Sequence, residues 1–126
     1  MRNWDLKSIE AVPHQPEILA SADDARTIVL HLPAGEALQE HEVHERARIV
    51  VVDGEIEMTT PAGDSVSAGP GRLFEFDPGE RHTVVARSDA RLLLILTPWP
   101  GDGHPGALTL EQKAEARQRA AQRSAD

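Results

Sequence analysis

The sequence predicts an all-β domain, an antiparallel sandwich or barrel built from about seven or eight short strands. Short runs rich in β-branched and aliphatic residues recur along the chain. Turn signals separate these runs roughly every 8–12 residues, a spacing typical of antiparallel sheets rather than βαβ units. Most of the nine Gly and nine Pro residues fall between the runs. With 126 residues, 40% of them hydrophobic, the chain is long enough for one domain with its own core.

Each predicted strand is a run that ends at a turn signal. The Asp53-Gly54 pair interrupts the longest of them, and Asp-Gly pairs are favoured in two-residue hairpin turns. We therefore expect the two strands beside this pair to form a hairpin. The runs are 26–32, the two parts of 47–60, 64–69, 72–76, 81–89 and 91–100.

The two ends of the chain differ from this central part. The segment Thr109–Arg123 is rich in Ala, Glu, Gln, Lys and Arg, which favour helix. Thr109 and Gln112 have the spacing of a capping box at its start. The predicted organisation is an N-terminal extension with a possible edge strand (1–25), a barrel (26–98), and a linker with a short C-terminal α-helix (99–126).

Composition excludes several classes of function. The chain has no cysteine, so disulfides and thiolate chemistry are absent. A formal net charge of −8 argues against nucleic acid as a partner, because such binding needs a basic face. No apolar run reaches membrane-spanning length and none resembles a signal peptide, so we expect a cytoplasmic protein without membrane contact.

Two segments have the spacing of known motifs. Gly35 is followed by five residues and His41, and Ala47 by six residues and Gly54. This arrangement resembles the first motif of the cupin superfamily, a group of small jelly-roll barrels.

The second motif of the same superfamily fits further along the chain. Gly71 is followed by five residues, then Asp77-Pro78-Gly79, then two residues and His82. The resemblance covers about Leu32–Pro98 and implies an antiparallel jelly-roll β-barrel.

The resemblance also implies a metal site, but an incomplete one. Metal-binding cupins usually supply histidines and a glutamate from these motifs. Here His41 and His82 keep their places, while Val43 stands in the place of a second histidine and Ala47 in the place of the glutamate.

Two alternatives for a third ligand remain open. In a regular strand successive side chains alternate between faces, so His41 shares a face with Glu45 and not with His44. A β-bulge between His41 and Ala47 would turn His44 inward instead. The candidate ligand sets are therefore His41, His82 and Glu45, or His41, His82 and His44.

The expected interior is mostly aliphatic, so a pocket there would suit a small organic molecule, although such side chains would also fill any small barrel. The predicted lining consists of Val43, Ala47, Ile49, Met58, Phe74, Phe76 and Val84.

Three functions are compatible with these features. The first is a barrel that binds a small molecule, with a degenerate histidine site that can hold one divalent metal (Fe, Mn, Ni or Zn). The second is a metal-dependent enzyme, a dioxygenase or an isomerase/lyase on a small organic substrate. The third is a structural or interaction barrel without a ligand. The resemblance further implies a homodimer.

Overall fold

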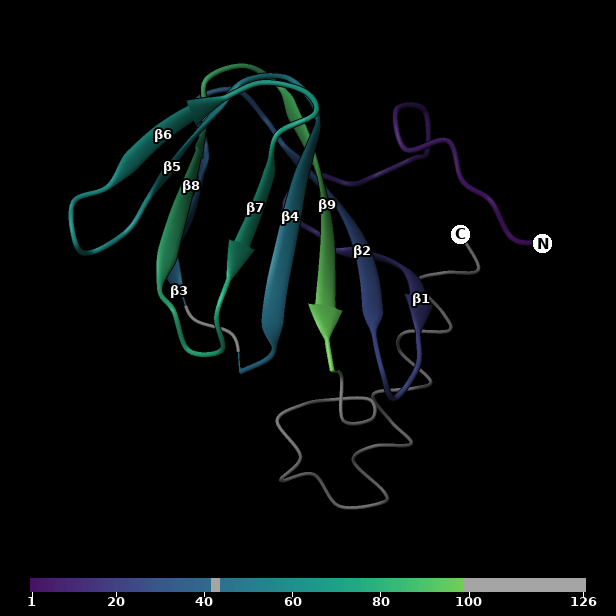
Figure 1. Ribbon diagram of the computed structural model, residues 1–126. Helices are drawn as coiled ribbons and strands as arrows, with labels where there is room; N and C mark the ends of the chain where they lie inside the picture. Colours follow the sequence, from purple (N-terminus) through teal and green to yellow (C-terminus); the bar gives the residue numbers. More distant parts are fainter. Residues whose placement is uncertain (42–43, 99–126) are drawn as a thin grey trace.

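Nine β-strands are present in the computed structural model, which describes residues 1–41 and 44–98, with the backbone alone at 39–41 (Figure 1). The C-terminal helix predicted from the sequence lies outside these residues. Among the described residues, no helix is long and apolar enough to cross a membrane. The strands are β1 (Glu17–Ser21), β2 (Arg26–Leu32), β3 (Ala37–His41), β4 (Arg46–Asp53), β5 (Ile56–Thr59), β6 (Ser65–Ala68), β7 (Leu73–Phe76), β8 (His82–Ala86) and β9 (Ala90–Thr97).

The strands form two antiparallel sheets that face each other (Figure 1). One sheet has the order β1-β2-β9-β4-β7 and the other β3-β8-β5-β6. From β2 to β9 the chain passes from one sheet to the other after most strands, which is the connectivity of a jelly roll. The predicted all-β, antiparallel jelly-roll fold is confirmed.

The predicted hairpin at Asp53-Gly54 is wrong, although a turn does form there. Strand β4 pairs with β7 and β9, whereas β5 pairs with β6 and β8, so this turn links the two sheets. Gly54 has φ of 79°, and a Cβ atom at this position would lie 2.1 Å from the carbonyl oxygen of Asp89. Glycine is needed because the backbone before β9 lies against the turn.

The core lies between the two sheets and is formed by alternate residues of each strand. In β4 the buried residues are Ala47, Ile49 and Val51, and in β8 they are His82, Val84 and Ala86. This period of two is expected for strands with one face on the core. Because His82 belongs to this alternation, a histidine lies among aliphatic side chains.

The N-terminal segment lies against the outer face of the five-stranded sheet at β2 and β9. The guanidinium of Arg91 donates hydrogen bonds to the carbonyl oxygens of Leu6 (3.2 Å) and Ile9. The backbone N–H of His14 donates to the carbonyl oxygen of His31 at 3.1 Å. Strand β1 then pairs with β2 at the edge of the sheet.

Candidate functional site

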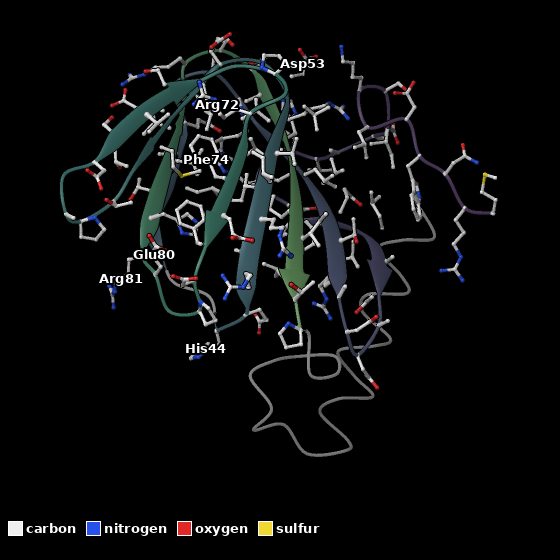
Figure 2. The ribbon with its side chains drawn as sticks, in the orientation of Figure 1. His44, Asp53, Arg72, Phe74, Glu80 and Arg81 are labelled. Carbon is white, nitrogen blue, oxygen red and sulfur yellow. The ribbon has the colours of Figure 1, made fainter. Side chains whose placement is uncertain are left out.

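Glu45 and His82 are the polar residues in the buried set of the described chain, with 4% and 1% of their surface exposed. Glu45 immediately precedes β4, and His82 is the first residue of β8. Figure 2 shows their chain neighbours, His44 and Arg81, at the same end of the barrel. Burial of a carboxylate or an imidazole costs free energy, so such groups are candidates for binding or catalysis.

The connection between β7 and β8 positions His82. The backbone N–H of Glu80 donates to the carbonyl oxygen of Asp77 at 3.0 Å, and the N–H of Asp77 donates to Oε1 of Glu80, also at 3.0 Å. Gly79 has φ of 82°, which favours glycine. These contacts close a tight turn that brings the chain from one sheet to the other.

An ion pair joins this turn to the start of β4. Nη1 of Arg46 donates to Oδ1 of Asp77 at 2.6 Å. This hydrogen bond raises the pKa of the Arg46 guanidinium above its usual value. Because Glu45 is the residue before Arg46, the pair brings Glu45 to the same corner of the barrel as His82.

The imidazole of His82 stacks on the phenyl ring of Phe76. The ring centroids are 4.0 Å apart and the planes differ by 13°. Phe76 is buried, and its neighbour across the ladder is Ala47. On the edge of the imidazole, Nδ1 lies 3.4 Å from the carbonyl oxygen of Glu80.

His41 is the backbone partner of His82 in the β3–β8 ladder. The ladder has a register shift between Leu38 and His41. The predicted bulge between His41 and Ala47 falls on a stretch that includes Glu42 and Val43, which lie outside the described residues. Val43 and the side chain of His41 lie outside the described residues. The backbone pairing nevertheless brings two histidine positions of the sequence motifs directly opposite each other.

The two candidates for a third ligand differ in burial. Glu45 is buried and continues the alternation of Ala47 and Ile49, whereas His44 is exposed at the end of the barrel (Figure 2). Of these two side chains, Glu45 is thus the one that faces the interior.

The predicted pocket residues lie in the core, where packing explains their burial as well as a pocket would. The described ones are buried or, for Phe74, packed against the buried cluster. These residues are Ala47, Ile49, Met58, Phe74, Phe76 and Val84. A separate pocket of about 530 Å³ is lined by residues between Glu10 and Glu17, away from His82 and Glu45.

The donor chemistry at the corner fits a divalent metal in part. An imidazole and a carboxylate are suitable ligands for the metals considered above. Within the side chains that the structure describes, no group of three or more His, Asp or Glu residues is close enough to hold a metal ion. A set of three ligands would therefore need a side chain outside the described ones, such as that of His41.

Two features of this corner were not predicted from the sequence. One is the stack of Phe76 on His82, and the other is the Arg46–Asp77 ion pair. The residues of the ion pair are 31 positions apart, so no local pattern indicates that they meet. The motif spacing located His82 but gave no information about the residues that hold its ring.

Comparisons with known proteins agree with this architecture. A family model described as "Cupin domain" matches residues 28–97. A solved RmlC-like cupin protein from Desulfovibrio desulfuricans is 20% identical, with a TM-score of 0.69 over 78% of this chain and 97% of that one. A cupin superfamily protein from Desulfitobacterium hafniense is 19% identical, with a TM-score of 0.65 over 73% of this chain and 85% of that one.

One of the similar structures has a stated activity. It is the DMSP lyase DddQ from Ruegeria pomeroyi, which is 19% identical, with a TM-score of 0.57 over 60% of this chain and 39% of that one. A search of curated proteins found no match. At these identities the structural similarities show the fold alone.

Proposed function

The chain belongs to the cupin domain family, and on this premise we propose that it binds a small organic molecule through a divalent metal held at one end of the barrel. The proposed ligands are His82, Glu45 and His41. The observation that carries the proposal is the burial of a carboxylate and an imidazole at the same corner, among aliphatic side chains. The backbone pairing of His41 with His82 supports its place in the set.

The proposed site would combine a metal with apolar surroundings, and both suit a small organic molecule. Three protein ligands would leave open positions on a metal, as a site that takes a small molecule requires. When bound, the metal would polarise an oxygen of the molecule as a Lewis acid. The neighbouring side chains of Ala47, Val84 and Phe76 are apolar and would accept an organic group.

The proposal predicts metal binding that depends on His82. Metal-stripped protein titrated with Fe²⁺, Mn²⁺, Ni²⁺ or Zn²⁺ in a calorimeter should bind at least one of them at about one equivalent per chain. His82→Ala should weaken this binding by about 100-fold or more, since even outer residues of metal sites contribute about 10–100-fold.

His31→Ala is the matched control, because His31 lies on β2, in a part of the sheet that the N-terminal segment approaches. The metal affinity of the His31→Ala protein should equal that of the unmodified protein. Equal affinities for all three proteins would contradict the proposed site.

A catalytic role is the second candidate. The observation that favours it is the burial of both a carboxylate and an imidazole, two groups that often transfer protons in enzymes. The test is depletion of a compound from a mixture of small organic acids and esters, followed by mass spectrometry. If the His82→Ala protein depletes the same compound as fast as the unmodified protein does, this would contradict a role for this site.

The outer face of the five-stranded sheet supports the expected homodimer. Leu73, Val50 and Leu93 are cross-strand neighbours on this face, and Leu73 is 57% exposed. Apolar rows of this kind are typical of protein interfaces.

We expect the unmodified protein to sediment with the coefficient of a dimer. The Leu73→Glu protein should sediment with the coefficient of a monomer, because a charge would then lie in the interface. Monomeric unmodified protein throughout a dilution series would contradict the dimer.

A further inference from the structure

The ring of His82 is held by two contacts of different kinds. One is the carbonyl oxygen of Glu80, 3.4 Å from Nδ1. A carbonyl oxygen only accepts hydrogen bonds, so this contact is favourable when Nδ1 carries the proton. In the neutral ring the lone pair then lies on Nε2, the nitrogen that can bind a metal or accept a proton.

The hydrogen bond alone is a weak constraint. At 3.4 Å it is longer than the usual 2.7–3.2 Å of such bonds, so rotation of the ring would cost little. The second contact is the face of Phe76, nearly parallel to the imidazole at a centroid distance of 4.0 Å. Rotation about the Cβ–Cγ bond of His82 would drive the imidazole edge into the phenyl ring, and the stack therefore restricts it.

Phe76 is itself well placed for this role. It is 4% exposed and lies at the end of β7, opposite the small Ala47. The turn that follows is fixed by the Asp77–Glu80 hydrogen bonds and by Arg46. The distance and angle between the two rings are consequently set by the corner between the sheets.

We infer that Phe76 is a positioning residue, whose ring fixes the orientation and tautomer of His82 so that Nε2 is presented to the ligand. The functional part of this inference rests on the metal site proposed above. The structural part, the control of the tautomer, does not depend on a metal.

The test compares variants of Phe76 in the full chain. Phe76→Leu and Phe76→Met remove the flat face but keep an apolar side chain, whereas Phe76→Tyr keeps the ring. Leu94→Val is the control, because Leu94 also packs against the core but lies on β9, outside the predicted lining. Two quantities are measured: the tautomer of His82, from the ¹⁵N shifts of its ring in NMR spectra, and the affinity for Zn²⁺.

The unmodified protein should show a single tautomer with the proton on Nδ1. A mixture of tautomers and about tenfold weaker Zn²⁺ binding are expected in Phe76→Leu or Phe76→Met, whichever folds, in the range for residues that orient metal ligands. Phe76→Tyr should keep the single tautomer and the Zn²⁺ affinity of the unmodified protein, and Leu94→Val should change neither.

The outcomes separate the two proposals. An unchanged tautomer in a folded Phe76→Leu or Phe76→Met protein would overturn the inference, since Phe76 would then only fill the core. A changed tautomer in a protein that binds no Zn²⁺ even when unmodified would support the positioning role and contradict the metal site.

Discussion

Exchanging Glu45 for alanine is expected to weaken metal binding by about 100-fold or more, whereas exchanging the adjacent His44 should leave the affinity unchanged. Glu45 is 4% exposed. It precedes Arg46, whose ion pair with Asp77 joins the start of β4 to the turn before His82. His44 is exposed. The measurement is calorimetric titration of both metal-stripped variants with the metal that the unmodified protein binds best.

Glu45→Gln refines this prediction. The amide keeps the size of the side chain but removes the negative charge that a divalent metal prefers, so its affinity should fall almost as far as in Glu45→Ala. Circular dichroism of each variant checks that the barrel is intact. A large loss in His44→Ala with an unchanged Glu45→Ala would show that the bulged ligand set is the correct one.

Leu92→Ala is expected to lower the free energy of unfolding by about 3 kcal/mol. Leu92 is fully buried on the central strand β9, in register with Leu30 of β2 and Val51 of β4. Truncation removes its transfer free energy and leaves a cavity that a closed barrel fills poorly. Because small domains are stable by only about 5–15 kcal/mol, this loss is a large fraction of the total.

Urea denaturation of the metal-free protein measures this effect. Val66→Ala is the control, since Val66 is 37% exposed on the edge strand β6. Its loss should stay below about 1 kcal/mol, the usual range for surface positions. Similar losses for the two variants would contradict the central place of β9 in the core.

Alternation along the strands predicted much of the fold. The alternation in β4 placed Ala47 and Ile49 in the predicted lining, and both are buried. Such patterns are local, so they survive in a single sequence. The parity argument that placed Glu45 on the face of His41 assumed one strand through both residues, whereas β3 ends at His41 and β4 begins at Arg46 in the other sheet. Glu45 is buried in step with Ala47 and Ile49 of β4.

Pairing between distant strands was less predictable. The Asp53-Gly54 signal correctly indicated a turn, but only the tertiary structure shows that it joins two sheets. The backbone before β9 lies against Gly54, and that segment is far away in the sequence. A local turn signal does not specify which strands it connects.

The surroundings of His82 were also beyond the sequence pattern. Its position came from the motif spacing, while the face of Phe76 and the carbonyl of Glu80 depend on how the turn between β7 and β8 closes. Phe76 had been predicted only as a wall of the pocket. Its contact with the imidazole is a property of the corner between the sheets.

The most direct test of the proposed metal site is the metal content of the full chain purified without an affinity tag, measured by elemental analysis beside His82→Ala and His41→Ala. We expect about one equivalent of a transition metal per chain after loading with Fe²⁺, Mn²⁺, Ni²⁺ or Zn²⁺, and its loss in both variants. Metal far below one equivalent, equal in all three proteins and not restored by loading, would contradict it.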